Sequence, residues 1–227
     1  MNLPPDQTQL CHVPHRHQQV PVVYCNGKTS IFSGDCSSQA TTRLLMDHMR
    51  HEHYFTIQHH FGYPPSRALK AYRRKWRERM GRRLARFCIE AAGEGKVDLV
   101  AHSMGCLISY YAMAQLRGYI RRFVFLSPAM RARVDWDFVD FEHGLVLTNE
   151  QDRALFWGAF FPGHPFGVRS AGRRGFDFGE EKIVHVDVPD KAKADFHRHS
   201  HYFREPAIHD VGFLVEDFLT GERPDEC

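Results

Sequence analysis

The amino-acid sequence predicts an α/β fold, an open, doubly wound and mostly parallel sheet of about six strands flanked by helices. Short apolar runs alternate with longer amphipathic runs, a pattern typical of parallel strands joined by crossover helices. The chain has 227 residues, of which 43% are hydrophobic and 25% charged, as expected for one globular domain. We therefore expect a single domain over residues 20–221, preceded by a flexible arm at residues 1–19 that is rich in Pro, Gln and His.

The first half of the chain predicts two strands and two helices. Residues 20–27 (VPVVYCNG) predict a strand that ends in a turn, and residues 54–63 predict a second strand. Residues 38–52 predict a helix with Ser or Thr near its start. From Leu69 to Phe87, apolar residues recur every three or four positions, so one face of a helix should pack on the core while its arginines face outward.

The second half predicts four more strands and two more helices. The strands are expected at residues 96–103, 121–130, 143–152 and 181–190. One helix should follow residue 103 and end at Gly118. The closing helix should span residues 205–221, with Pro206 in its first turn and Gly221 at its end. Right-handed crossovers would bring the carboxyl ends of all strands to one edge of the sheet, where such folds build their sites.

The composition indicates in which compartment the protein is expected and whether it inserts into a membrane. No apolar run approaches the roughly 20 residues of a membrane span, so we expect no stable membrane insertion. The N-terminus has no apolar signal-peptide core, and the six cysteines form no CxxC pair. These features predict a cytoplasmic protein with reduced thiols.

Positive charge is concentrated in residues 67–86, which hold ten Lys or Arg and one Glu, whereas the rest of the chain has a net charge of −6. Such a segment could contact phosphate groups of nucleic acid or of an anionic membrane. We favour a solvated outer face of a helix that packs on the sheet, and we expect no nucleic-acid partner.

Sixteen histidines raise the question of a metal site. They cluster at residues 11–17, 48–53 and 197–201, but none of these groups has the paired spacing of a zinc site. The sequence therefore predicts neither a metal nor another cofactor.

Ser103 lies between a strand-like and a helix-like run in VDLVAHSMGCLISYYA, residues 97–112. Ala101 and Gly105 flank it at two positions on either side, as a serine on a very sharp turn requires. Such a turn lifts the hydroxyl above the sheet edge, and the N-terminus of the following helix can stabilise an oxyanion. This arrangement predicts acyl transfer through a covalent ester on Ser103.

The segment AHSMG resembles the G-x-S-x-G nucleophile elbow of the α/β-hydrolase family, with Ala101 in place of the first Gly. The element order of residues 20–220 resembles the same family, in a small form without a large cap domain. The resemblance implies a Ser-His-Asp triad in the chain order serine, acid, histidine.

The family's acid should follow the second strand after the elbow. Here that strand is expected at residues 143–148, and Asp152 lies in the loop beyond it. Glu150 is the close alternative, and Asp135 or Asp137, after the preceding strand, is a further one.

The family's histidine should precede the closing helix, where His197, His199 and His201 all lie. In many members a proline follows the catalytic histidine by seven residues, and Pro206 then selects His199. The string HSHYF also resembles the family's His-Ser-x-aromatic-aromatic variant and selects the same residue. We prefer His199 as the general base, with His201 second.

The resemblance also implies an oxyanion hole. One donor should be the backbone N–H of Met104, and the other should come from the loop YCNGKTS after the first strand. This loop resembles the family's His-Gly turn with Asn26 in place of His, so Lys28 is expected to supply the second N–H. Gly27 would permit the unusual backbone angles of that turn.

Together these features predict a serine hydrolase that cleaves a carboxylic ester. A thioester or an amide is the alternative substrate. The aromatic residues of ALFWGAFFPGHPFG, 154–167, suggest an apolar acyl group and a small-molecule or lipid-like substrate. Residues 155–180 could form a lid or pack on the core. The alternative function is a catalytically silent hydrolase fold that acts as a binding module.

Overall fold

The computed structural model describes residues 20–25, 45, 58–61, 73–158, 170–177, 181–188, 198–203 and 207–221. The strands are β1 (Val22–Cys25), β2 (Gln58–Phe61), β3 (Val97–His102), β4 (Ile120–Leu126), β5 (His143–Thr148) and β6 (Ile183–Asp187). The helices are α2 (Arg74–Ala92), α3 (Met104–Met113), α4 (Arg153–Gly158), α5 (Ala171–Arg174), the 3-10 helix η2 (Arg198–Phe203) and α6 (Ala207–Thr220). Each predicted strand is present within its expected span, except that β4 begins one residue earlier, at Ile120.

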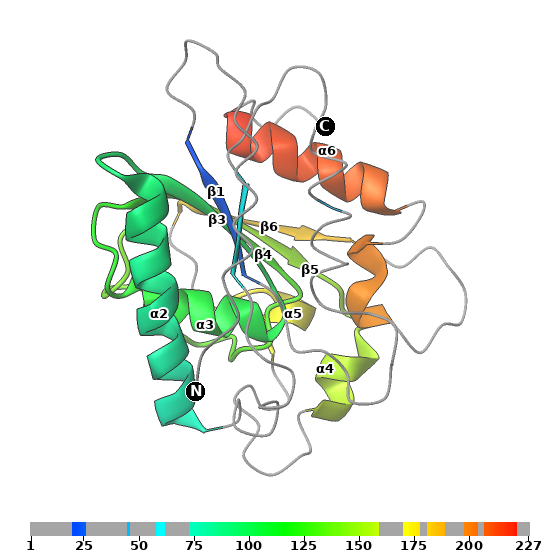
Figure 1. Ribbon diagram of the computed structural model, residues 1–227. Helices are drawn as coiled ribbons and strands as arrows, with labels where there is room; N and C mark the ends of the chain where they lie inside the picture. The colour runs from blue at the N-terminus through cyan, green and yellow to red at the C-terminus, as the bar shows by residue number, and fades with distance from the viewer. Residues whose placement is uncertain are drawn as a thin grey trace.

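The six strands form one parallel sheet in the order β2-β1-β3-β4-β5-β6. The chain moves outward from β1 to β2 and then returns to place β3 on the other side of β1 (Figure 1). Because the strand order reverses there, β1 and β3 border the switch point at which open α/β sheets bind ligands. The predicted doubly wound parallel sheet is confirmed.

Alternate residues of the central strands enter two separate cores, one on each face of the sheet. The face covered by α2 and α3 contains Val23, Cys25, Leu99, Ala101, Phe123, Phe125 and Val146. The face covered by α6 and η2 contains Val22, Tyr24, Val100, Val124, Leu126, Leu145 and Leu147. Figure 1 shows the helices on the two sides of the strands. Near-continuous apolar strands are what two covered faces require.

Helix α2 packs on the sheet as predicted, with Met80 and Leu84 buried in the first core. A side chain at Gly81 would place its Cβ 2.6 Å from the Cβ of Tyr111 on α3. Glycine is therefore what permits the two helices to approach so closely.

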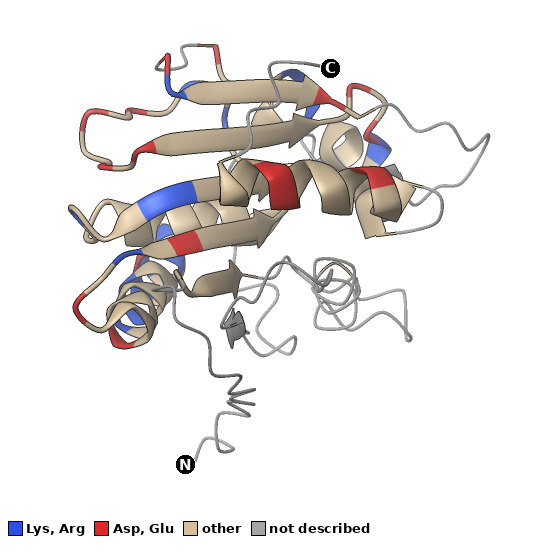
Figure 2. Cartoon of the chain, turned by 90° about the horizontal axis from the view of Figure 1, so that it is seen from above, with Lys and Arg blue, Asp and Glu red and all other residues tan. Residues whose placement is uncertain are grey.

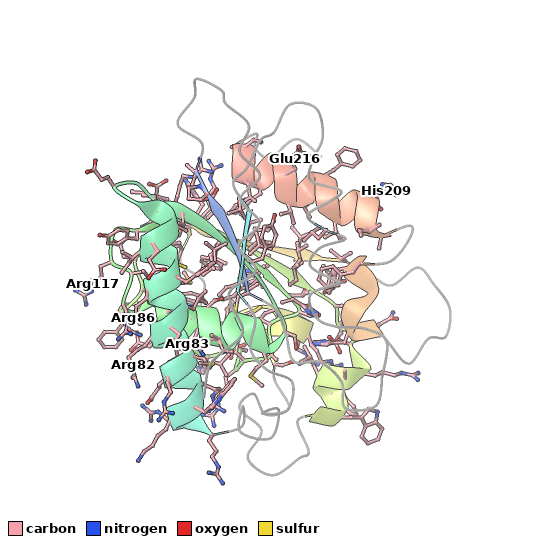
Figure 3. The ribbon with its side chains drawn as sticks, in the orientation of Figure 1. Arg82, Arg83, Arg86, Arg117, His209 and Glu216 are labelled. Atoms are coloured by element: carbon pink, nitrogen blue, oxygen red, sulfur yellow. The ribbon has the colours of Figure 1, made fainter. Side chains whose placement is uncertain are left out.

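The prediction that the arginines of α2 face outward holds for most of them and is wrong for Arg77. Arg82, Arg83 and Arg86 are exposed and project away from the core (Figure 3). Arg77 is buried, because it lies one turn before Gly81 on the face of α2 that packs against the rest of the protein. Leu69, whose spacing began the predicted helix, lies outside the described residues.

Helix α3 is shorter than expected, since it ends at Met113 rather than near Gly118. A turn follows it, in which the N–H of Leu116 donates to the carbonyl of Met113. Gly118 instead has a φ of +79° in the turn before β4, and its N–H donates to Asp140. The glycine therefore serves the entry to a strand rather than the end of the helix.

A buried ion pair ties the amino ends of β3 and β4 to the end of α6. Asp98 on β3 is fully buried and accepts from the Nε of Arg121 at 2.9 Å and from the backbone N–H of Arg122 at 3.1 Å. The two guanidinium groups also donate to the carbonyls of Phe218 and Leu219, near the end of α6. Figure 2 shows the basic band on β4 beside the acidic position on β3. The arginines thus satisfy helix-end carbonyls that would otherwise lack donors.

The predicted candidate lid, residues 155–180, is described only in part. Residues 170–177 lie against the loops that follow β4 and β5: the N–H of Gly172 donates to the carbonyl of Pro128, and the N–H of Asn149 donates to the carbonyl of Gly172. Ala171 belongs to the first core. Residues 159–169 and 178–180 lie outside the described residues.

Two other predicted segments fall mostly or wholly outside the description. Of the helix expected at residues 38–52, only Leu45 is described, and it is helical and buried in the second core. The N-terminal arm, residues 1–19, lies outside the described part. None of the helices in the described ranges is long and apolar enough to cross a membrane.

Candidate active site

Ser103 occupies a strained turn between β3 and α3. Its backbone has φ +56° and ψ −123°, angles that a residue other than glycine rarely adopts. Its N–H donates to the carbonyl of Leu126 at 2.9 Å, and its own carbonyl accepts from the N–H of Ala129 at 3.0 Å. The end of β4 and the loop after it therefore hold the strained residue from both sides, and the side chain stays at the carboxyl edge of the sheet.

His199 connects Ser103 to Asp152 through both of its ring nitrogens. Its Nε2 lies 2.6 Å from the Oγ of Ser103, and its Nδ1 lies 2.6 Å from the Oδ2 of Asp152. A carboxylate can only accept, so Nδ1 carries the proton and Nε2 is free to accept from the serine hydroxyl. The three residues expected to act together thus lie in one hydrogen-bonded row.

Asp152 is held in this row by more than the histidine. Its side chain is fully buried, its Oδ1 accepts from the backbone N–H of Leu155 at 2.9 Å, and its Oδ2 accepts from the hydroxyl of Ser127 at 3.0 Å. Burial by itself would raise the pKa of Asp152, but the charge of His199 and the hydrogen bonds from His199, Leu155 and Ser127 outweigh it and lower that pKa below its ordinary value. Asp152 is therefore anionic at neutral pH.

The alternative acids lie elsewhere. The Glu150 side chain is 69% exposed and points to Arg174 at 4.0 Å, while its backbone carbonyl accepts from Arg173. Asp135 and Asp137 are exposed in the loop after β4. None of the three contacts His199 in the described structure.

Among the alternative bases, His201 follows His199 in the same 3-10 helix, and its side chain lies outside the description. His197 is likewise outside the described residues. His199 is thus the histidine that the structure joins to both Ser103 and Asp152.

Of the two predicted oxyanion donors, one can be located. Met104 is the first residue of α3 and is buried directly after Ser103. The first N–H groups of a helix have no partner within it and carry the positive end of the helix dipole. Lys28, with Asn26 and Gly27, lies outside the described residues.

His102 was not anticipated as part of the site. Its Nε2 lies 3.0 Å from the carbonyl oxygen of His199, and because a carbonyl only accepts, this nitrogen donates. The two imidazole rings lie 4.9 Å apart between centroids, and the Phe203 ring contacts His102 in an edge-on arrangement. The available signal was its place at the carboxyl end of β3, next to the serine.

Two hydroxyls behind Asp152 were also missed. Ser127 follows β4 directly, and Tyr202 belongs to the HSHYF string of η2. Both are fully buried, and their oxygens lie 3.1 Å apart. In the sequence, only their position near the end of β4 and of η2, at the edge of the sheet that carries the site, pointed to them.

A hollow of about 260 Å³ lies beside the loop that carries the acid, lined by Glu150, Gln151, Asp152, Arg153, Phe156 and Arg173. The guanidinium of Arg173 lies 5.1 Å from the centre of the Phe156 ring, and Phe156 also contacts the exposed Trp157. The lining of the hollow thus combines an aromatic ring with both cationic and acidic residues. In the described part of the chain, no cluster of three or more His, Cys, Asp or Glu residues could hold a metal ion.

Comparison with known proteins identifies the family. The family model of the alpha/beta hydrolase fold matches residues 20–174. A serine hydrolase involved in carbazole degradation, the CarC enzyme, is similar in structure at 15% identity with a TM-score of 0.59, over 88% of this chain and 91% of that one.

Two further solved structures have a similar fold. A dienelactone hydrolase from Anabaena variabilis has 14% identity and a TM-score of 0.53, over 89% of this chain and 86% of that one. A gene product of Listeria innocua has 15% identity and a TM-score of 0.53, over 92% and 96% of the two chains. No curated protein matches the sequence. From the family match, the strained serine turn and the sheet order, the chain belongs to the α/β-hydrolase family.

Proposed function

We propose that the protein is a serine hydrolase that cleaves carboxylic esters through Ser103, His199 and Asp152. The observation that carries the proposal is the continuous hydrogen-bonded row from the serine hydroxyl through both histidine nitrogens to a buried carboxylate. Nucleophile, base and orienting acid in this order are what acyl transfer requires. No cofactor is needed for this chemistry.

In the first half-reaction, the Oγ of Ser103 attacks the acyl carbon of the ester while its proton passes to the Nε2 of His199. Asp152 keeps the imidazole in the tautomer with the proton on Nδ1 and stabilises the resulting cation. When the tetrahedral intermediate collapses, the bond to the leaving oxygen breaks. His199 then gives its proton to the departing alcohol, and an acyl group remains on Ser103.

In the second half-reaction, water replaces the alcohol. His199 takes a proton from the water as the hydroxide attacks the acyl carbon, and it returns that proton to the Oγ of Ser103 as the carboxylic acid leaves. In both steps negative charge develops on the carbonyl oxygen, and we propose the N–H groups of Met104 and Lys28 as its donors.

We propose that the substrate carries an apolar acyl group, as a small-molecule or lipid-like ester. Phe156 and Trp157 contact one another on α4, which begins directly after Asp152, and Trp157 remains 57% exposed. Exposed aromatic surface beside a reactive centre favours an apolar ligand. Two further aromatics of the sequence segment, Phe160 and Phe161, lie outside the described residues.

The test is covalent labelling with a fluorophosphonate probe, followed by peptide mass spectrometry and by hydrolysis of p-nitrophenyl esters of increasing acyl length. We expect labelling at Ser103 that is lost in Ser103→Ala and strongly reduced in His199→Ala, but retained in His201→Ala. We also expect kcat/KM to rise with acyl length. A folded protein that neither labels nor turns over any ester would refute the proposal.

A binding module is the second candidate, favoured by the exposed basic face of α2. Arg82, Arg83 and Arg86 are exposed on it, and none of these three has an ion-pair partner among the described residues. Salt-sensitive binding of anionic vesicles by a protein without esterase activity would support this alternative.

A further inference from the structure

We propose that Ser127 and Tyr202 are positioning residues that fix the carboxylate of Asp152 against His199. This inference rests on the proposed function, because it concerns how the acid of that triad is held. The hydroxyl of Ser127 lies 3.0 Å from the Oδ2 of Asp152 and 3.1 Å from the hydroxyl of Tyr202. The hydrogen-bonded row therefore continues beyond the acid into the second core.

The direction of these hydrogen bonds follows from the groups themselves. An ionised carboxylate only accepts, so the single proton of Ser127 goes to Asp152. The hydroxyl of Tyr202 then donates to Ser127 at 3.1 Å, a shorter contact than the 3.5 Å to the carbonyl of Leu147. Burial raises the pKa of Tyr202 far above its ordinary value, which keeps that hydroxyl protonated as a donor. Tyr202 thus orients Ser127, and Ser127 orients Asp152.

The carboxylate of Asp152 makes all of its hydrogen bonds in one orientation. Its Oδ2 accepts from both His199 and Ser127, while its Oδ1 accepts from the N–H of Leu155. Rotation of the carboxylate away from His199 would break the bond to Ser127 as well. The hydrogen bond from Ser127 therefore makes this rotation of the Asp152 carboxylate harder than the hydrogen bond to His199 alone would.

Backbone strain occurs at two residues of this row. Among the described residues other than glycine, only Ser103 and Ser127 have a positive φ, +56° and +41° respectively. Such strain persists only where the surroundings enforce it, and it tends to collect at functional sites. Ser103 is the proposed nucleophile, and Ser127 is the residue that contacts the acid.

The loop around Ser127 joins the nucleophile and the acid directly. Leu126 accepts from the N–H of Ser103, Ala129 donates to the carbonyl of Ser103, and Ser127 between them donates to Asp152. The N–H of Ser127 is itself held by the carbonyl of Leu147 at 3.0 Å. One segment, from the end of β4 into the loop after it, thus fixes the backbone of Ser103 and the side chain of Asp152 together.

The experiment compares Ser127→Ala, Ser127→Gly and Tyr202→Phe with the wild-type protein in p-nitrophenyl ester hydrolysis. Both Ser127 variants should lower kcat about tenfold with KM unchanged, since a positioning group acts on the chemical step. Tyr202→Phe should lower kcat about threefold. Glycine tolerates the positive φ, so an equal loss in Ser127→Gly and Ser127→Ala assigns the effect to the hydroxyl rather than to strain.

Matched controls remove hydroxyls that do not belong to the row. Ser109→Ala removes a serine on α3 that is as buried as Ser127, and Tyr110→Phe removes a hydroxyl that donates to the carbonyl of Asp135. Both control variants should keep the wild-type kcat. A kcat loss in the controls equal to that in the Ser127 variants would overturn the proposal, because it would then reflect general destabilisation.

A second readout separates this proposal from the proposed function. The proton between the Nδ1 of His199 and Asp152 should give a downfield proton NMR resonance, which the Ser127 variants should weaken or shift in folded protein. If the wild-type protein hydrolyses no ester, the proposed function fails, and this resonance still tests the positioning of Asp152. An unchanged resonance together with an unchanged kcat would overturn the role of Ser127 and Tyr202.

Discussion

The Nε2 atom of His199 lies 2.6 Å from the Oγ atom of Ser103, although 96 positions separate the two residues in the chain. The contact exists because η2 returns the chain to the sheet edge just before α6 and docks beside β3. His102, the residue before Ser103, donates to the backbone carbonyl of His199 and so secures η2 at this place. The expected chemistry therefore depends on contacts that only the folded chain makes.

We expect Asp152→Asn to lower kcat for ester hydrolysis by about 10³- to 10⁴-fold, because an amide no longer selects the tautomer in which His199 can accept the serine proton. Steady-state kinetics with a p-nitrophenyl ester measures the loss. Glu150→Gln is the matched control, since that side chain is exposed, and it should leave kcat unchanged. A large loss of kcat in Glu150→Gln, together with an active Asp152→Asn, would show that Glu150 rather than Asp152 is the acid.

Asp152 should also make stability depend on pH. Its pKa is lower in the folded protein than the ordinary value of 3.8, so its ionised form contributes stability above that value. This contribution is lost as pH falls through the lowered pKa. Urea unfolding of the wild-type protein and Asp152→Asn should show a stability difference that is constant at neutral pH and shrinks below about pH 4. A difference that does not change between pH 7 and pH 3 would contradict the assigned direction.

The buried cysteines should resist alkylation in the native protein. Burial raises the pKa of Cys25 to about 12 and raises the pKa values of Cys88 and Cys106 as well. At pH 8 only about one Cys25 thiol in ten thousand is then the reactive thiolate. Iodoacetamide treatment with peptide mapping should modify these three residues only after unfolding in urea. If these cysteines were labelled as fast in the native protein as in the unfolded chain, the result would contradict their burial.

Asp98 should stabilise the fold without affecting the chemistry. Asp98→Asn leaves the partly buried Arg121 without its counter-charge and should lower the free energy of unfolding by about 3 kcal/mol, measured in urea. Lys96→Ala breaks the exposed pair with Glu142 and should cost at most about 1 kcal/mol. The folded fraction of each variant should keep the wild-type kcat. Equal costs for the two variants would contradict the structural distinction between the pairs.

Local patterns in the sequence were sufficient to predict much of the fold. Short β-rich runs predicted all six strands, and the central strands are largely apolar because both faces of the sheet are covered there. The small residues around Ser103 predicted a sharp turn, and the backbone there has the expected positive φ. Arg77 and the end of α3 were predicted wrongly, since the burial of one arginine and the length of one helix depend on how α2 and α3 pack.

For the site, the sequence by itself determined which residue types stand in which order: a serine after β3, an acid after β5 and a histidine before α6. Only the tertiary structure decided that Asp152 rather than Glu150 meets His199, because one side chain is buried at the sheet edge and the other is exposed. It alone also brought Ser127 and Tyr202 together, 75 positions apart in the chain. Hydrogen bonds of this kind are set to within fractions of an ångström by strand register and helix docking, which spacing along a chain does not specify.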